Sequence, residues 1–462
     1  MLKKTDAVLF TPGLPVRRMV PRLFPIVVLL MSLMTACQEP EKPEPYPNSN
    51  LVLEKLDVSC TEAWLKLSLT RTDSGATDSI PIILTRDGEA IQPFAFTPPE
   101  TLVMDAGLYP SQSYQYQAQR QSVHDNKVIN SSNTLTVTTL DTTSHDFTWT
   151  IDTLGSYGSY LNDVAIIDEN NIWAVGDVQT DSGRYNLAKW DGSRWNLSLF
   201  GVAGVSGDGI FAFSEGDVWI TTGIIYHWND GQWERYHLWD MGVLGPNDGG
   251  VTRVWGSSPE DDVWFVGNGG SIVHYDGSGF ERMESGTEVD LHEIHGTADG
   301  EYIFFQGKHW QGYRTILLQL HHGIISKIYE CETMSPGEND YGYLYSSYLS
   351  GYAVISATTA GVWQYNYMTE QSVLIPDEVT DSGDRNVQVI IGNNTIDYIL
   401  AGNWWKLIHF NGISYRYNDQ IVQLIGEGGS KLNGGDMRGN LAVICGDVFW
   451  WSHAAVAFGR RQ

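Results

Sequence analysis

The chain has 462 residues, a length that suggests roughly two or three domains. It is rich in aromatic residues and glycine and lacks long amphipathic helical patterns, which indicates an all-β protein with many tight turns. Its formal net charge is −27. Because a phosphate backbone would be repelled by so acidic a surface, we expect no nucleic acid among its partners.

Residues 1–36 have the features of an export signal. Basic residues lead into an apolar run over residues 23–31, which is too short to remain in a bilayer as a spanning helix. The run ends at Met34-Thr35-Ala36-Cys37, which resembles the lipobox of bacterial lipoproteins. This resemblance implies that residues 1–36 are a lipoprotein signal peptide and that Cys37 is acylated and attaches the protein to a membrane. The alternative is a secretory signal with an incidental cysteine.

Residues 37–50 form an acidic, proline-rich tether, because proline at this density keeps a chain extended. Gln38, in the position after the cysteine, resembles lipoproteins that are sorted to an outer membrane. We therefore expect a lipid-anchored protein at the outer membrane or cell surface of a Gram-negative bacterium. Met19 also begins a signal of ordinary length, so translation from Met1 or from Met19 stays open.

Residues 51–142 contain short β-type runs divided by Asp, Gly, Ser and Thr turns, which predicts a β-sandwich. Leu108, Pro110 and Tyr114 match the Leu-x-Pro-x-x-x-Tyr signature of fibronectin type III domains, which this segment resembles. The resemblance implies that Tyr114 forms a corner by hydrogen-bonding back to the preceding turn. It also makes Trp64 the candidate for the tryptophan usual in the second strand.

A repeated unit fills the rest of the chain. A strand of the Asp-Val-Trp type, seen at 171–176, 217–223 and 262–267, is followed by a strand that ends in an aromatic residue and then Asp-Gly or Asn-Gly. These dipeptides predict hairpins in which both turn positions have positive φ. The period of 40 to 50 residues matches four short antiparallel strands, the blade of a β-propeller. The small residues that close the apolar strand are Gly176, Gly223, Gly267, Gly307, Ala357, Gly402 and Gly446.

The seventh unit lacks room for its outer strand after Gly459. Residues 147–154 precede the first unit and resemble such a strand. We therefore predict an all-β chain in which the sandwich is followed by a seven-bladed β-propeller over residues 147–462, closed by strand 147–154. Closure removes the sheet edges that would invite aggregation. The repeat resembles the Asp-Val-Trp-x-Val-Gly propellers of exported bacterial proteins.

Enzyme signatures are missing: the sequence has no His-Glu-x-x-His helix, no Gly-x-Ser-x-Gly elbow and no Walker loop. We expect no cofactor. We also expect no metal, since His321 and His322 beside Gly323 have the pattern of a turn, without the spacing of a metal site. Trp404 and Trp405, and the aromatic run 449–451, are candidates for stacking on sugar rings, although packing between units is the interpretation we favour.

Most units carry a polar residue 10 to 15 positions before the closing residue. The innermost strands of a propeller line its channel, so these side chains are candidates for contacting a ligand at the channel mouth. The alternative is that they hydrate the channel and bond to turn backbone. The candidates are Asp163, Asp208, Arg253, Glu293, Gln388 and Asp436.

These features favour a membrane-anchored, extracytoplasmic binding or scaffold lipoprotein that recognises glycan or protein through the propeller mouth. The alternative is an exported glycan-active hydrolase or lyase on the same scaffold. Two carboxylates within about 10 Å of each other would favour the enzyme. Carboxylates bonded to backbone would favour the binding module.

Overall fold

The computed structural model describes residues 44, 50–70, 79–309, 311–333, 341–376, 387–402, 405–425, 431–448 and 452–461. Cys37, the expected signal peptide and most of the tether lie outside the described residues, as do Trp404 and the run 449–451. Within the described part of the chain, no helix is both long and apolar enough to cross a membrane.

The first domain consists of two packed antiparallel sheets. One has the strand order β1-β2-β5 and the other β4-β3-β6-β7, with β8 also paired to β6. The strands are β1 (Leu51–Val58), β2 (Glu62–Leu69), β3 (Ile80–Arg86), β4 (Glu89–Phe96), β5 (Glu100–Ala106), β6 (Ser113–Gln121), β7 (Val128–Ser131) and β8 (Leu135–Thr138). Their inward side chains form one buried apolar cluster.

Two aromatic residues of this domain behave differently. The Tyr114 hydroxyl accepts a hydrogen bond from the backbone N–H of Tyr109 at 2.9 Å, so it reaches back across the preceding turn. Trp64 is not part of the buried cluster, although Leu65 and Leu67 of the same strand are. Side chains alternate between the two faces of a strand, and Trp64 therefore lies on the face of β2 away from the core.

The second domain contains seven four-stranded antiparallel sheets among the described residues, here numbered I to VII. Sheets I to III consist of β10 (Tyr160–Asp168), β11 (Asn171–Thr180), β12 (Gly183–Trp190) and β13 (Trp195–Ser198); β14 (Gly209–Ser214), β15 (Asp217–Thr221), β16 (Ile225–Asn229) and β17 (Gln232–Tyr236); and β18 (Val251–Ser258), β19 (Asp262–Gly267), β20 (Ile272–Tyr275) and β21 (Phe280–Met283).

Sheets IV to VI repeat this order. They consist of β22 (Leu291–Gly296), β23 (Tyr302–His309), β24 (Arg314–His321) and β25 (Ile324–Cys331); β26 (Leu344–Ser350), β27 (Ala353–Thr358), β28 (Gly361–Asn366) and β29 (Gln371–Pro376); and β30 (Val387–Asn394), β31 (Asp397–Gly402), β32 (Leu407–Phe410) and β33 (Tyr415–Asn418). The short helix α2 (Gln420–Ile425) follows β33.

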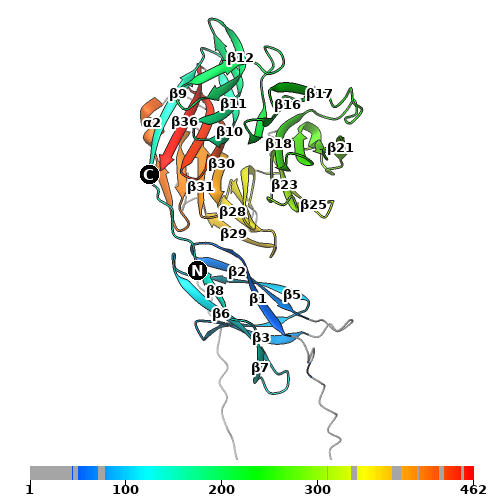
Figure 1. Cartoon of the computed structure of the whole chain (residues 1–462), viewed down its shortest axis with the longest axis vertical. Coiled ribbons are helices and arrows are strands. Elements are labelled where there is room, and N and C mark those ends of the chain that lie inside the picture. The colour runs from blue at the N-terminus through cyan, green and yellow to red at the C-terminus, as the bar shows by residue number, and fades with distance from the viewer. Residues whose placement is uncertain are drawn as a thin grey trace, which may run out of the picture.

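Sheet VII combines the two ends of the domain. Its strands are β34 (Lys431–Arg438), β35 (Leu441–Val448), β36 (His453–Arg461) and, as the outermost, β9 (Phe147–Leu154). Every residue of β9 pairs with β36, from Phe147 opposite Arg461 to Leu154 opposite Ala454. Figure 1 shows this red and cyan pair side by side.

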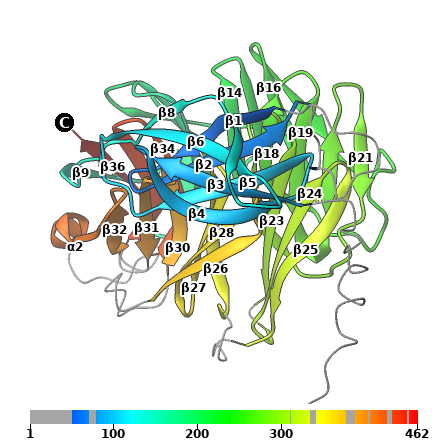
Figure 2. The ribbon, with the colours of Figure 1, turned by 90° about the horizontal axis from the view of Figure 1, so that it is seen from below.

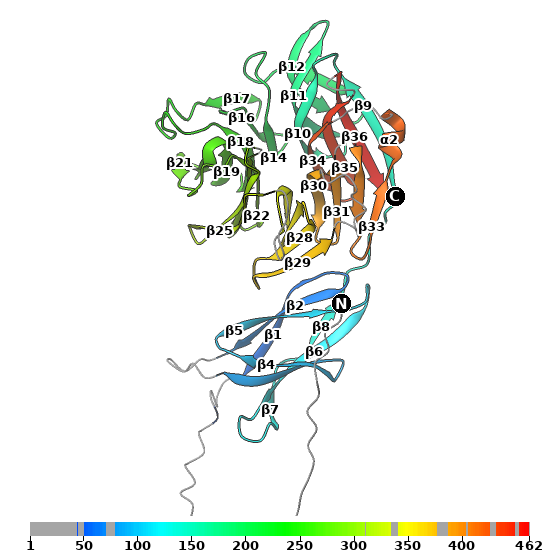
Figure 3. The same cartoon turned by 180° about the vertical axis from the view of Figure 1, so that it is seen from behind.

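Each consecutive pair of sheets shares a buried apolar cluster, and sheet VII shares one with sheet I. Trp173 lies between sheets I and II, and Trp219 between sheets II and III. The inner strands β10, β14, β18, β22, β26, β30 and β34 contact one another in that order, and β34 contacts β10. The sheets therefore surround a common centre (Figures 1 and 3), which is the architecture of a β-propeller.

Two closing glycines of the repeat, Gly176 and Gly446, are required by close approach of the backbone, whereas a Cβ on Gly223 would meet nothing within 4 Å. A Cβ on Gly176 would lie 2.3 Å from the carbonyl oxygen of Tyr160, and one on Gly446 would lie 2.0 Å from that of Lys431. Both positions face a bulge in the inner strand, where the register shifts by one residue. In sheet V this position is Thr358, which pairs with Leu344, rather than the expected Ala357.

The Asp-Gly turns take two forms. Asp230 and Gly231 both have positive φ, as a two-residue hairpin turn requires. At Asp191 only the following glycine has positive φ, and the aspartate carboxylate accepts hydrogen bonds from the backbone N–H groups two and three residues later. Asp276 and Asn411 do the same. The expectation of positive φ at both turn positions is therefore wrong for these copies, because a side-chain cap shapes the turn instead.

The sandwich lies next to sheets V and VI (Figures 1 and 2). The linker after β8 runs along the β32–β33 turn, where the backbone N–H of Thr143 donates to the carbonyl of Asn411 at 3.2 Å and the Asn411 amide returns a hydrogen bond. Asp57 of β1 approaches the β26–β27 turn, since a Cβ on Gly351 would lie 2.5 Å from its carboxylate. The two domains are thus in contact at two places.

Candidate functional site

A cavity of about 230 Å³ lies between the inner strands of the propeller domain. The strands bring charged, aromatic and imidazole side chains to its wall. The lining includes Asp163, Arg253, Glu293, His295, Tyr348 and Asp436. Four of the six residues predicted from the sequence therefore line one cavity, whereas Asp208 and Gln388 do not.

The six predicted residues occupy three different registers. Asp163, Arg253 and Glu293 each follow the bulge of their inner strand and pair with the residue before the closing glycine. Asp208 and Gln388 are one residue earlier than this register: Gln388 lies at the bulge of β30, and Asp208 directly precedes β14. In sheet VII the residue equivalent to Asp163 is Gly434. Asp436 lies two residues after Gly434 and therefore lines the channel at a different depth.

We call the ring of residues at the register of Asp163 the upper layer of the channel, and the ring at the register of Asp436 the lower layer. The upper layer contains Asp163, Gly209, Arg253, Glu293, Ser346, Val389 and Gly434. The lower layer contains Ala165, Phe211, Trp255, His295, Tyr348, Ile391 and Asp436. Four lining residues, Ser346, Trp255, His295 and Tyr348, were not among those predicted from the sequence. Side chains alternate between the two faces of a strand, so these residues could have been predicted by counting two positions along from one known lining residue in each inner strand.

Two carboxylates of the channel join neighbouring sheets. Asp163 of sheet I accepts a hydrogen bond from the backbone N–H of Ile210 in sheet II at 3.1 Å. Asp436 of sheet VII accepts one from Ile166 in sheet I at 2.8 Å. The innermost strand of each sheet has an unpaired edge, and these N–H groups require acceptors when they are buried.

The same arrangement recurs on the other side of the ring. Glu293 of sheet IV accepts a hydrogen bond from the backbone N–H of Ser347 in sheet V. The Ser346 hydroxyl of sheet V accepts one from Ile390 in sheet VI at 3.1 Å. In all four cases the acceptor side chain bonds to the next sheet, and the N–H donor there is the residue directly after the one that occupies the same layer as the acceptor. The polar residues of the channel therefore hold inner strands together.

The second oxygens of both aspartates are also committed. Asp163 accepts a hydrogen bond from the N–H of Val164 at 2.9 Å, and Asp436 from that of Met437 at 2.8 Å. Burial raises the pKa of Asp163 to about 6, although the nearby Arg253 opposes the shift. Burial also raises the pKa of Asp436 and Glu293. These carboxylates are backbone acceptors in a poorly solvated site.

Arg253 differs from its neighbours. Its Nη1 donates to the carbonyl oxygens of Asp208 at 2.6 Å and of Thr252 at 3.0 Å. Within the described residues, its Nε and Nη2 have no protein hydrogen-bond partner, and the side chain lines the cavity. It also lowers the pKa of Asp163 and of Glu293 through its charge. Arg253 thus offers guanidinium donors to a ligand that carries oxygen acceptors.

The tryptophans of the repeat serve packing. Trp219 is fully buried and stacks on His227 at 3.7 Å, and His227 in turn contacts Asp217 at 2.9 Å. Trp405 is buried, and its indole N–H donates to the carbonyl of Asp447 at 3.3 Å. A side chain in these positions cannot stack on a sugar ring.

These observations define a β-propeller protein with a central cavity lined by both polar and apolar side chains. No protein-family model matches the chain, and no curated protein matches it by sequence. Among solved structures, it resembles the β-propeller domain of the Trilobed protease from Pyrococcus furiosus, with TM-score 0.40, 12% identity, and 65% of this chain and 95% of that chain covered.

It also resembles a quinonprotein alcohol dehydrogenase-like protein from Bacteroides thetaiotaomicron, with TM-score 0.31, 9% identity, and 87% of this chain and 94% of that chain covered. A nidogen/laminin complex gives a TM-score of 0.35 at 8% identity, with 59% and 95% covered. The strand pairing of the present chain, rather than these distant resemblances, defines its fold.

Proposed function

We propose that this protein is a membrane-anchored, extracytoplasmic binding lipoprotein that recognises a glycan or protein ligand at the mouth of a closed, seven-bladed propeller. Strand β9 completes the seventh blade. The sandwich before it is a fibronectin type III-like domain, which the strand order and the hydrogen bond of Tyr114 support. The lipobox at residues 34–37 supports attachment through Cys37 at the outer membrane or cell surface.

One observation carries the choice of binding over catalysis. The aspartates of the channel use both carboxylate oxygens to accept backbone N–H groups, so each carboxylate is held in place as a link between strands. Arg253, in contrast, keeps donors for a ligand. Trp255 and Tyr348 line the same cavity and supply ring faces for apolar contact.

A ligand with carboxylate or hydroxyl oxygens fits this lining best. Arg253 would donate to those oxygens, while His295, whose pKa burial lowers to about 4, would be neutral and able to donate or accept. An acidic sugar and an acidic peptide segment both carry such groups. The net charge of −27 makes a broad contact with a strongly acidic surface unfavourable, so recognition would be confined to the channel mouth.

A second candidate function is a glycan-active hydrolase or lyase. The observation that favours it is the pKa of about 6 for Asp163, whose value is raised further by the charge of Asp436. A buried carboxyl with such a pKa is suited to general acid catalysis. The carboxylate would first have to leave the N–H groups of Val164 and Ile210.

A glycan array probed with the soluble fragment 48–462 tests the proposal. We expect retention of glycans that carry acidic groups, and no retention by an Arg253→Gln variant. Absence of binding to every glycan would reject the glycan form of the proposal. Incubation of retained glycans with the fragment separates the second candidate, because an enzyme would release shorter products and an Asp163→Asn variant would not.

A further inference from the structure

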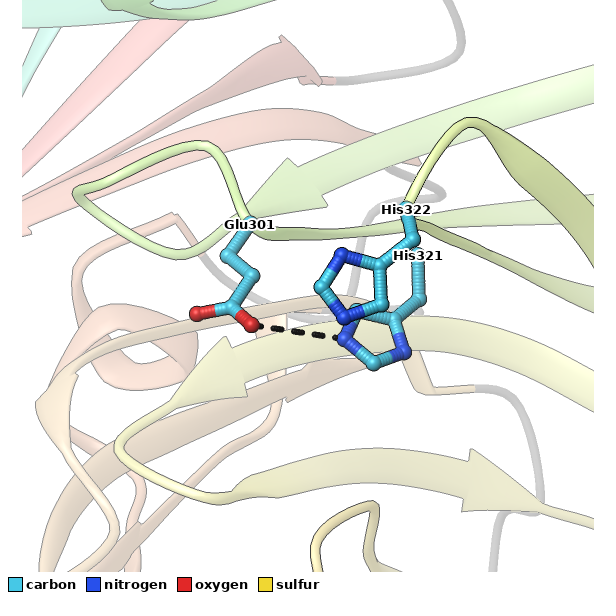
Figure 4. A group of neighbouring side chains, drawn as sticks. All are labelled: Glu301, His321 and His322. Carbon is cyan, nitrogen blue, oxygen red and sulfur yellow. Dashed lines mark hydrogen bonds and ion pairs between the residues drawn. The ribbon is translucent and has the colours of Figure 1, made fainter.

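A cluster of possible metal ligands lies on sheet IV, outside the channel. Glu301, just before β23, lies beside His321, the last residue of β24, and His322, which follows it; one ligand atom from each residue lies within 4.8 Å of the others (Figure 4). Nε2 of His321 is 3.4 Å from the carboxylate of Glu301. Glu301 and His322 are exposed and His321 is partly buried, so solvent ions can reach all three.

Two consecutive residues of a strand normally point to opposite faces. His322 instead has a φ of 51°, in the left-handed region, because it begins the turn that Gly323 completes. Its ring consequently lies next to that of His321, with 3.9 Å between their centroids. The ring of His321 is fixed on its other side by stacking on Tyr302 at 3.9 Å. The turn therefore presents two imidazoles on one side of the sheet.

Other copies of the repeat also place a carboxylate beside a histidine, as Asp217 does beside His227 at 2.9 Å. Asp262 contacts His274 at 2.9 Å and accepts further hydrogen bonds from the indole of Trp264 and the hydroxyl of Ser257. In sheet IV the residue at the register of Trp264 is Phe304, which has no indole N–H to donate. Within the described residues, the Glu301 carboxylate contacts only His321.

We propose that Glu301, His321 and His322 form a binding site for a divalent transition-metal ion of the Zn²⁺ type. Two imidazoles and one carboxylate are ligands that Zn²⁺ prefers. With bonds of about 2.0 to 2.2 Å, tetrahedral ligands lie roughly 3.3 to 3.6 Å apart. The separation of 3.4 Å between His321 and Glu301 is in this range, and rotation of the exposed His322 side chain brings the third ligand into place. Water would complete the coordination.

The three substitutions that remove one ligand each are Glu301→Gln, His321→Gln and His322→Gln. His274→Gln is the matched control, because it removes the histidine of an acid–histidine pair that has no third ligand. The test uses the untagged fragment 48–462 after dialysis against a chelator. Calorimetric titration with ZnCl₂, and the visible absorption of Co²⁺ as a second probe, report stoichiometry and affinity. Thermal melting of each variant confirms that it is folded.

We expect one Zn²⁺ per chain in the parent fragment, with affinity reduced at least about tenfold in Glu301→Gln and His322→Gln and unchanged in His274→Gln. The proposal is overturned if the parent binds no ion at one equivalent, or if folded His322→Gln binds Zn²⁺ as tightly as the parent. A loss in His274→Gln equal to that in His322→Gln would also overturn it.

Discussion

The carboxylate of Asp436 in the last inner strand accepts a hydrogen bond from the backbone N–H of Ile166 in the first inner strand, at 2.8 Å. These residues are 270 positions apart in the chain. The bond repeats, one layer deeper, the contact that Asp163 makes to Ile210 between sheets I and II. A polar residue that the sequence offered as a ligand contact therefore joins the two ends of the ring.

Replacement of Asp436 by alanine should destabilise the propeller by about 1 to 3 kcal/mol, because the N–H of Ile166 loses its acceptor in a buried site. Asp436→Asn keeps a carbonyl oxygen that can accept one hydrogen bond and should cost less. Asp208→Ala is the control, since the Asp208 side chain accepts no such bond and should change stability by less than about 0.5 kcal/mol. Urea unfolding followed by tryptophan fluorescence measures the three differences. Equal stability of Asp436→Ala and the parent would contradict this role.

Asp163 should make the protein less stable as the pH rises from about 4 to about 6. Its pKa in the folded protein is about 6, above the ordinary value of 3.8, so between these values the folded state binds the proton more tightly than the unfolded state. Asp163→Asn cannot ionise and should lack this contribution. Between pH 4 and pH 7 the free energy of unfolding of the parent should fall relative to that of the variant as the pH rises. Parallel curves would show that the carboxyl has no such shift.

Removal of Arg461 should destabilise sheet VII strongly. Its guanidinium donates two hydrogen bonds to the almost fully buried Asp397, at 2.7 and 2.8 Å. In Arg461→Ala the Asp397 carboxylate keeps its contact with His409 but loses the guanidinium. For a buried pair this should lower the free energy of unfolding by about 3 to 5 kcal/mol. Arg460, the neighbouring arginine, is exposed and provides the control variant Arg460→Ala. A similar small drop in melting temperature for both variants would disprove the importance of the pair.

Strand β9 should be necessary for folding of the propeller. Phe147 and Trp149 are buried in the cluster that joins sheets VI and VII, and the whole strand pairs with β36. We expect a fragment of residues 143–462 to be soluble and to melt cooperatively. A fragment of residues 155–462 should be insoluble or unfolded, because it exposes the edge of β36 and the apolar side chains that Phe147 and Trp149 cover. Cooperative melting of the shorter fragment would show that the seventh sheet is stable with three strands.

The sequence predicted the repeated sheets better than the channel. The Asp-Val-Trp strands and their glycines carry strong signals, because buried tryptophan and close backbone approach each tolerate few residue types. The bulge in each inner strand carries no such signal. Counting back from the closing glycine therefore grouped Asp163 with Asp436, although Asp436 lies two residues beyond Gly434, the residue of its strand that is equivalent to Asp163.

The cluster on sheet IV was missed for a related reason. Glu301 lies 20 residues before His321, and only the pairing of β23 with β24, in which Tyr302 is opposite His321, brings them together. The unit that contains them lacks the Asp-Val-Trp pattern, so alignment of the copies gave no partner for His321. Cross-strand neighbours depend on register, which spacing along the chain does not reveal.

The most direct test of the binding role compares Arg253 with Asp163. The affinity of the parent fragment for an acidic glycan retained on the array is measured by calorimetry and compared with the affinities of folded Arg253→Gln and Asp163→Asn. Loss of charge-assisted hydrogen bonds of about 1.5 to 3 kcal/mol predicts that Arg253→Gln binds roughly 10- to 100-fold more weakly. Asp163→Asn should bind like the parent, because its side chain serves the backbone. Unchanged binding by Arg253→Gln together with lost binding by Asp163→Asn would contradict the account.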